Sequence, residues 1–385
     1  MQPSEVADAT RISLQEIKAL GSASSPCVSI LIPIESAPGQ TRQNQVRLRH
    51  GIEKAKGLLS EKGIEARPFV ERIEAIVGHL QLSGEGLAVY CSPDVCRAFE
   101  LSATVSDAVM VGDHFYVTPL IPLLDADRPF YILALSQKHP RLLRCEGRTA
   151  VEVALPEPTP KSLWDDKQSD QPDHEQEGHS SGGPDQGGMK GVSFSTNTDS
   201  ERHLQYLAHF YKHVSEGVAE LLKGEAAPVV IAGVDYEIAA FRRVNAYPHL
   251  VEDAVHGSAD GLKGGELHKR ALEAMRTHLR KPLEAALARY DQLAGSDRGC
   301  SKIKEIVAAA FDGRILELVV GETARYIGNF EESTHVVKGR KEPADGDEDL
   351  LNAAALQTLL HAGQVFVVPS AQVPHGAPAV AVFRW

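Results

Sequence analysis

Apolar residues follow two patterns along this chain, continuous short runs and longer segments with an apolar residue at every third or fourth position. Continuous runs indicate strands that are covered on both faces. They occupy residues 27–34, 86–92, 130–136, 229–235, 315–320 and 379–383. The periodic segments predict amphipathic helices, for which the clearest cases are residues 41–60, 68–80 and 204–221, and a further helix is predicted over residues 347–361. Helices that alternate with buried strands predict an α/β protein.

Two breaks in the pattern predict three domains. Residues 125–129 form a short polar connection that ends at a proline, and Pro282 interrupts a long helical pattern that it should break or kink. A chain of 385 residues is also too long for one ordinary core. We therefore predict α/β domains over residues 1–124, 125–282 and 283–385, each with a parallel or mixed sheet covered by helices.

A long segment without hydrophobic periodicity, residues 157–199, lies inside the central domain. It carries a run of acidic residues and then the glycine cluster SGGPDQGGMKG over residues 181–191. Such a composition cannot bury enough apolar surface to offset the entropy of ordering. Because long insertions in compact domains are usually functional or disordered, we expect this loop to project into solvent and to order against a partner.

The order of these central elements, strands, loop and long helix, resembles the bacterial branch of the archaeo-eukaryotic release factor and Pelota superfamily. The resemblance continues through PVVIAGVDYEIAAFRRV (228–244), SKIKEIVAAAFDGRILELVVGE (301–322) and the closing residues 349–385. It implies a release-factor-like central domain, a Pelota-like C-terminal domain and a site on the ribosome. Its implied partners are the rRNA of both subunits and an elongation-factor GTPase.

The tripeptide GGQ, which this family presents to the peptidyl-transferase centre, is absent from the chain. The nearest glycine and glutamine residues are Gly182, Gly183, Gln186, Gly187 and Gly188. Pro184 and Asp185 separate Gln186 from the first glycine pair, so a fixed φ and a negative charge stand where RNA would approach. Gln186 is therefore only a weak catalytic candidate, and the sequence favours a factor without hydrolytic activity.

Nucleic-acid contact must use a local basic patch, because the formal net charge is -12. Three arginines lie near the N-terminus of the helix predicted at 41–60, where they oppose the helix dipole. Together with the glycine loop they form the predicted RNA-binding set: Arg42, Gln43, Asn44, Arg47, Arg49, Gly182, Gly183, Gly187, Gly188 and Lys190.

We predict no metal ion and no cofactor. His209 and His213 share a helix face and could bind a metal, but no cysteine or carboxylate motif accompanies them. Solvated or pocket-lining histidines are therefore the favoured interpretation. The five cysteines resemble small buried apolar residues of a reducing cytosol, and neither a signal peptide nor a membrane span is evident. These features predict a cytoplasmic protein with no membrane partner.

Three functions fit these observations. The favoured one is a ribosome-binding factor without hydrolytic activity, which occupies the A site of idle or stalled ribosomes in hibernation, as Balon-type factors do, or in rescue. An alternative is a release or rescue factor that hydrolyses peptidyl-tRNA through Gln186. A third is a non-ribosomal interaction protein with the same fold. Loss of the GGQ tripeptide favours the first over the second.

Overall fold

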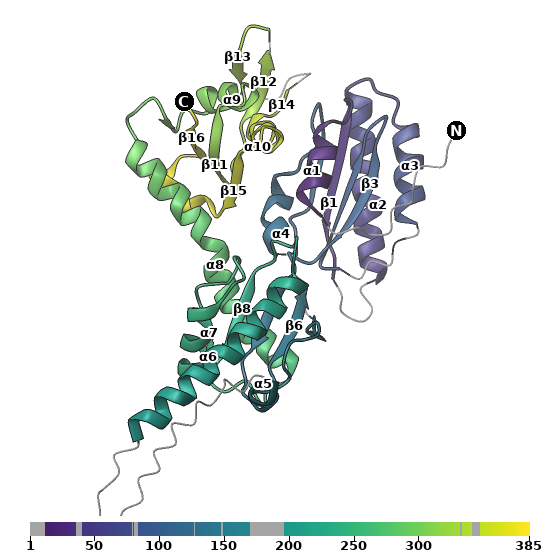
Figure 1. Cartoon of the computed structure of the whole chain (residues 1–385). Coiled ribbons are helices and arrows are strands. Elements are labelled where there is room, and N and C mark those ends of the chain that lie inside the picture. Colours follow the sequence, from purple (N-terminus) through teal and green to yellow (C-terminus); the bar gives the residue numbers. More distant parts are fainter. Residues whose placement is uncertain are drawn as a thin grey trace, which may run out of the picture. The chain divides into compact units, whose positions relative to one another are not determined.

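The computed structural model describes residues 12–35, 41–78, 80, 84–126, 128–147, 149–169, 196–331, 333–340 and 347–385. The chain forms two compact units, the first from Met1–Asp127 together with Lys281–Trp385, and the second from Arg128–Arg280 (Figure 1). Both units combine helices with sheets, which confirms the α/β class. Within the described ranges, no helix is long and apolar enough to cross a membrane. The division into three domains stays a prediction.

The N-terminal part of the first unit contains a four-stranded sheet in the order β3-β2-β1-β4. Its strands are β1 (Cys27–Pro33), β2 (Gly86–Cys91), β3 (Cys96–Leu101) and β4 (Ala108–Gly112). All three pairings are antiparallel, whereas a parallel or mixed sheet was expected. The continuous apolar runs correctly predicted that both faces of the sheet are covered, but burial of both faces does not determine strand direction. The short connection from β2 to β3 forms a hairpin, which requires antiparallel strands.

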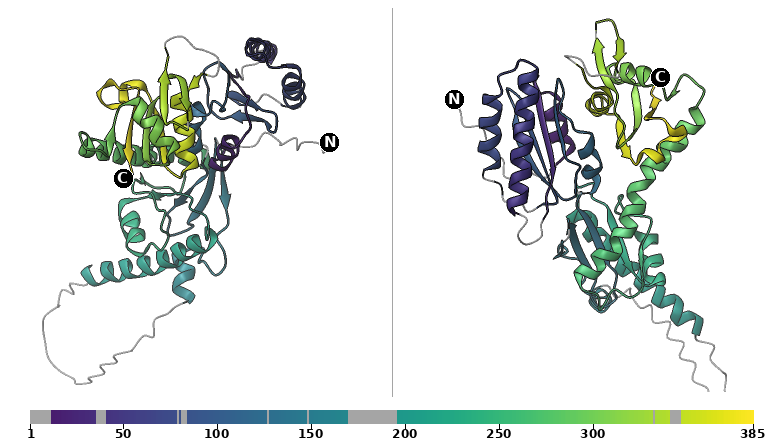
Figure 2. Two further views of the ribbon diagram at one scale, coloured as in Figure 1. Left: turned by 90° about the horizontal axis from the view of Figure 1, so that it is seen from above. Right: turned by 180° about the vertical axis from the view of Figure 1, so that it is seen from behind.

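Helices cover both faces of this sheet (Figure 2). One face packs on α2 (Thr41–Glu61) and α3 (Arg67–Val77), and the other packs on α1 (Leu14–Gly21). The turn η1 (Thr118–Leu120) and α4 (Ile121–Ala126) follow the sheet. In α2 the buried residues are Leu48, Ile52, Ala55 and Leu59. Val46 is apolar but 59% exposed, because it lies off this stripe.

The C-terminal part of the first unit has a mixed sheet in the order β10-β16-β11-β15. Its elements are α9 (Ile303–Phe311), α10 (Leu350–Leu360), β10 (Gly299–Cys300), β11 (Ile315–Gly321), β15 (Gln364–Val368), β16 (Ala379–Phe383), η2 (Ser370–Gln372) and η3 (Pro374–Gly376). A small second sheet of β12 (Ile327–Glu331), β13 (Val336–Gly339) and β14 (Glu348–Asp349) lies in a region for which the sequence pattern predicts no strand. Polar residues in both β12 and β13 interrupt the apolar pattern by which strands are predicted.

The second unit is a mixed five-stranded sheet in the order β7-β6-β5-β8-β9. Its strands are β5 (Phe130–Ala134), β6 (Arg141–Glu146), β7 (Thr149–Val153), β8 (Val229–Gly233) and β9 (Val255–His256). One face packs on α6 (Thr196–Leu221) and α7 (Asp235–Val244), and the other on the first half of α8 (Gly264–Leu293). The helix α8 continues through Pro282, which was expected to break or kink it. The predicted loop 157–199 contains a short helix, α5 (Leu163–Ser169).

Candidate functional site

The glycine-rich segment that carries Gln186 lies outside the described residues. The same holds for the other predicted contact residues of that loop, Gly182, Gly183, Gly187, Gly188 and Lys190. Their roles therefore stay predictions. The structure does describe the two helices that flank residues 170–195, namely α5 before them and α6 after them.

The packing of α6 on its sheet determines where its polar face lies. Leu207, Phe210, Tyr211, Val214 and Val218 recur at steps of three or four, and all of them are buried in one core with strands β5 and β8. This spacing places a continuous apolar stripe toward the sheet. The histidines His209 and His213 lie beside the stripe, four residues apart, so their imidazoles point to the same side of the helix.

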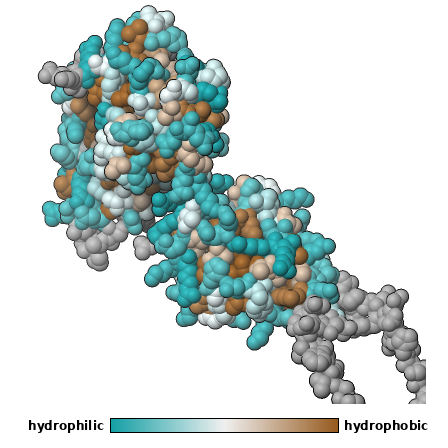
Figure 3. Space-filling view, turned by 90° about the vertical axis from the view of Figure 1, so that its left-hand side faces the viewer, coloured by the Kyte–Doolittle hydropathy of each residue, from teal (hydrophilic) through white to brown (hydrophobic). Residues whose placement is uncertain are grey.

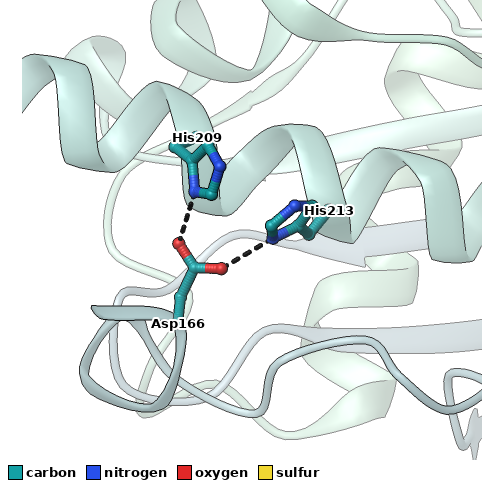
Figure 4. Close-up of side chains that lie close together, drawn as sticks. All are labelled: Asp166, His209 and His213. Atoms are coloured by element: carbon teal, nitrogen blue, oxygen red, sulfur yellow. Dashed lines mark hydrogen bonds and ion pairs between the residues drawn. The ribbon is translucent and has the colours of Figure 1, made fainter. Parts of the chain in front are cut away.

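Asp166 of α5 lies between these two imidazoles (Figure 4). Its Oδ2 is 3.1 Å from Nδ1 of His209, and its Oδ1 is 2.7 Å from Nδ1 of His213. The Asp166 side chain is only 4% exposed, whereas those of His209 and His213 are 42% and 33% exposed. The carboxylate is therefore enclosed by the protein, and the histidines form its border with solvent. The sequence did not point to Asp166, because 43 residues separate it from His209.

The position of Asp166 is set by the short helix that carries it. Ser162 begins this helix, since its Oγ accepts a hydrogen bond from the backbone N–H of Asp165 at 3.1 Å. Leu163 is buried, and its own N–H donates to the carbonyl oxygen of Gln137 at 2.8 Å. These contacts attach α5 to the end of strand β5. The carboxylate is thus held from one side by the sheet and from the other by α6.

A groove of about 780 Å³ opens beside His213. Carboxylates dominate its charged lining, and they belong to Glu157, Asp165, Asp166, Glu216 and Glu220. Lys161 is the single lysine among the residues that line it, and its Nζ lies 4.0 Å from Glu157. The groove therefore carries excess negative charge, which attracts cations and repels nucleic-acid phosphates.

The predicted RNA-binding residues of α2 divide into exposed and buried ones. Arg42, Gln43 and Arg49 are exposed. Asn44 is 2% exposed, and both of its amide atoms are bonded to the backbone of Glu35, at 3.1 Å and 3.0 Å. Asn44 therefore secures the end of β1 and does not reach the surface. Arg47 is half-buried and forms an ion pair with the Glu35 carboxylate at 2.5 Å.

The first turn of α2, which contains Arg42, has no acidic residue. The exposed Val46 lies between Arg42 and Arg49 at helical steps of four and three, so one apolar and two cationic side chains share a face. Such a face suits a phosphate-rich partner with exposed bases or sugars. Over the view in Figure 3, hydrophilic residues are interspersed with small groups of apolar ones.

Comparison with known proteins supports the resemblance seen in the sequence. Residues 129–314 match bacterial archaeo-eukaryotic release factor family 3, which confirms the release-factor-like character of this part of the chain. This matched region covers the second unit from its second residue onward, together with the start of the C-terminal part. No curated protein matches the chain.

Several solved structures align with most of the chain at low identity. Dom34 of S. cerevisiae, a translation termination-like factor, is 10% identical, with 78% of this chain and 79% of that chain covered and a TM-score of 0.39. Pelota of Archaeoglobus fulgidus is 15% identical, with 78% and 79% covered and a TM-score of 0.32. The archaeal termination factor aRF1 is 16% identical, with 97% and 99% covered and a TM-score of 0.22.

Proposed function

We propose that this protein is a ribosome-binding translation factor that occupies the A site of idle or stalled ribosomes and does not hydrolyse peptidyl-tRNA. The observation that carries the proposal is the match of residues 129–314 to a release factor family in a chain that lacks GGQ. The proposed role is hibernation or rescue, and it places the protein in the cytoplasm. Its proposed partners are the rRNA of both subunits and an elongation-factor GTPase.

The exposed face of α2 supports rRNA contact by the N-terminal part of the protein. Arg42 and Arg49 are both exposed and lie on one side of the helix, so they can reach neighbouring phosphates. Arg42 lies in the first turn of α2, where a cation opposes the helix dipole, and a bound polyanion would neutralise this cost. Arg47 contributes less, because Glu35 already pairs with it.

Cosedimentation with vacant 70S ribosomes through sucrose, at several salt concentrations, tests this proposal. We expect the parent chain to bind at near-physiological salt. The double substitution Arg42→Ala/Arg49→Ala should weaken binding and should reduce the slope of log affinity against log salt by about 1 for each phosphate that is no longer neutralised. A matched double substitution of exposed cations elsewhere, Arg243→Ala/Lys304→Ala, should leave both the affinity and the slope unchanged.

A release assay on programmed ribosomes, run in parallel, separates the alternative functions. Binding without release of the peptide supports the proposal. Release that is lost in Gln186→Ala would instead make the protein a peptidyl-tRNA hydrolase. Failure of the parent chain to sediment with ribosomes at any salt concentration would favour the non-ribosomal interaction protein. Equal binding by the parent chain and Arg42→Ala/Arg49→Ala would show only that the face of α2 does not contact the ribosome.

A further inference from the structure

We propose that Asp166, His209 and His213 bind a divalent transition metal ion of the zinc type. The three residues each offer one ligand atom, and these atoms all lie within 4.8 Å of one another. Two imidazoles and one carboxylate form a ligand set that zinc accepts, with a further position left for water or an outside group. This inference does not depend on ribosome binding.

The spacing of the donor atoms suits a metal ion with little rearrangement. Ligands around a tetrahedral zinc ion lie about 3.4 Å apart, because each is about 2.1 Å from the metal. The Nδ1 atoms of His209 and His213 lie 3.1 Å and 2.7 Å from the two oxygens of Asp166. Their imidazole rings are inclined at 72° with centroids 4.4 Å apart, so they do not stack and can converge on one point. Small rotations of the side chains open the space for the ion.

The backbone that carries the ligands is already ordered by the core. The two histidines are four residues apart on α6, whose neighbouring Phe210 and Val214 are fully buried. Asp166 is 4% exposed and belongs to a helix that Leu163 anchors. A preorganised ligand set lowers the entropy cost of binding, as in engineered metal sites whose supporting contacts are fixed. The site therefore does not require the metal in order to fold.

The surrounding charge favours a cation. Beside the three ligands, the groove is lined by further carboxylates, among them Asp165, Glu216 and Glu220. Asp166 is largely enclosed, and a buried carboxylate is costly unless its charge is compensated. A divalent ion would supply this compensation directly.

The donor atoms also determine which metals are expected. Imidazole nitrogen is a good ligand for zinc, nickel and copper, whereas magnesium and calcium prefer sites made of oxygen alone. We therefore expect zinc to bind in the presence of a large excess of magnesium. Bound metal would join α5 to α6, the helices on either side of residues 170–195.

A zinc titration tests the site. Metal is first removed from the purified protein with a chelator, and zinc is then added in competition with a chromogenic indicator. The parent chain should bind one zinc ion through these residues, and magnesium should not displace it. His209→Ala and His213→Ala should each weaken binding by about 100-fold or more, since loss of even an outer-sphere partner costs about 10–100-fold at metal sites. His203→Ala, an exposed histidine on the same helix, is the matched control and should bind as the parent does.

Asp166→Asn keeps the shape of the side chain and one acceptor oxygen, so it should fold even if an alanine variant does not. Its zinc affinity should fall because the amide is a poor ligand for zinc. Zinc should raise the melting temperature of the parent chain and of His203→Ala, but not that of Asp166→Asn. The cobalt complex of the parent chain should absorb in the visible region, and this absorption should be missing in Asp166→Asn.

The thiols of Cys91 and Cys96, whose sulfur atoms lie 2.7 Å apart, are the competing zinc ligands that must be excluded. Zinc binding that persists in Cys91→Ser/Cys96→Ser supports the proposed site. Binding that survives the histidine substitutions but is lost in this double serine variant would overturn the proposal. Absence of zinc binding by the parent chain would overturn it as well and would identify the cluster as a hydrogen-bonded link between α5 and α6. None of these measurements involves ribosomes, so they are independent of the proposed function.

Discussion

Asn352 and Thr118 are 234 residues apart in the chain, yet the side-chain oxygen of Asn352 accepts hydrogen bonds from both the backbone N–H and the hydroxyl of Thr118, at 3.1 Å and 2.9 Å. The same oxygen accepts from the N–H of Val117, and the amide nitrogen donates to the carbonyl oxygen of Phe115, both at 2.9 Å. Asn352 is buried in α10. The side chain of Asn352 therefore supplies hydrogen-bond partners for the polar groups of this buried turn, and it joins the N-terminal and C-terminal parts of the first unit.

We expect Asn352→Ala to destabilise the protein by about 2–4 kcal/mol, because it leaves several buried polar groups without partners. Urea unfolding followed by circular dichroism measures this change. Gln15→Ala, at an exposed position of α1, is the control and should change stability by less than about 0.5 kcal/mol. An equally small effect of Asn352→Ala would show that these hydrogen bonds do not hold the first unit together.

The burial of His268 predicts that the stability of the protein decreases as the pH falls. Its imidazole is buried and stacks on Phe130, with ring centroids 5.8 Å apart, and burial lowers the pKa of His268 below its ordinary value of 6.5. The unfolded chain therefore binds this proton more readily than the folded one. The contribution of His268 to stability is complete above pH 6.5 and is lost as the pH falls below that value, toward its lowered folded pKa.

Comparison of the parent chain with His268→Phe isolates this contribution. Phenylalanine keeps an aromatic ring against Phe130 but does not titrate. The stability of the parent chain relative to His268→Phe should therefore decrease between about pH 7.5 and pH 5.5. Denaturant unfolding at several pH values provides the measurement. Parallel pH profiles for the two proteins would contradict the assignment.

Gly217 allows the segment before α5 to approach α6 closely. A Cβ atom at this position would overlap the hydroxyl of Thr159 and lie 3.2 Å from its Cβ. Gly217→Ala should therefore destabilise the protein by about 1–2 kcal/mol, although alanine is intrinsically the better helix former by about 1 kcal/mol. Thr159→Ala should recover part of this loss when both changes are combined, as a double-mutant cycle will show.

Gly57→Ala is the matched control for the glycine at position 217. It lies in α2, and a Cβ there would meet nothing within 4 Å. We expect this change to stabilise the protein by about 0.5–1 kcal/mol, as the helix propensity of alanine predicts. Stabilisation of similar size at position 217 would contradict the close approach of Thr159.

Cys91 and Cys96 lie opposite each other across strands β2 and β3, and the thiol of Cys96 donates to the sulfur of Cys91. This hydrogen bond lowers the pKa of Cys91, while Cys96 is the partly exposed thiol of the pair. Diamide, which takes up the two thiol hydrogens as it is reduced to a hydrazine, should therefore form a disulfide between them. Mass spectrometry should show a loss of two hydrogens and a peptide that joins the two cysteines. Cys96→Ser should not show this loss, and any loss of two hydrogens in that variant would assign the reaction to other cysteines.

Local patterns in the sequence were sufficient for most helices and buried strands. The stripe of α6 and the buried strand β1 both follow from residues that are close together in the chain. Their apolar spacing directly reflects which side faces the core. The resemblance in the central region was also visible in the sequence, and the match over residues 129–314 confirms it.

Pairing between distant segments could not be read in this way. The antiparallel direction of the first sheet, the hairpin of β12 and β13, and the burial of Asn44 against Glu35 depend on which segments meet. A polar residue has the same appearance in the sequence whether it faces water or caps a buried strand. Prediction of RNA contact from residue type therefore included Asn44 although its amide is already bonded.

The candidate metal site shows most clearly the difference between what local sequence predicts and what depends on tertiary contacts. The sequence by itself determined that His209 and His213 share a helix face, because a helix repeats about every four residues. Only the tertiary structure decided that Asp166 would stand between them, since no periodicity relates residues 43 and 47 positions apart. That contact arises because α5 and α6 both pack against one sheet, and the apolar cores that fix those helices also bring their polar faces together.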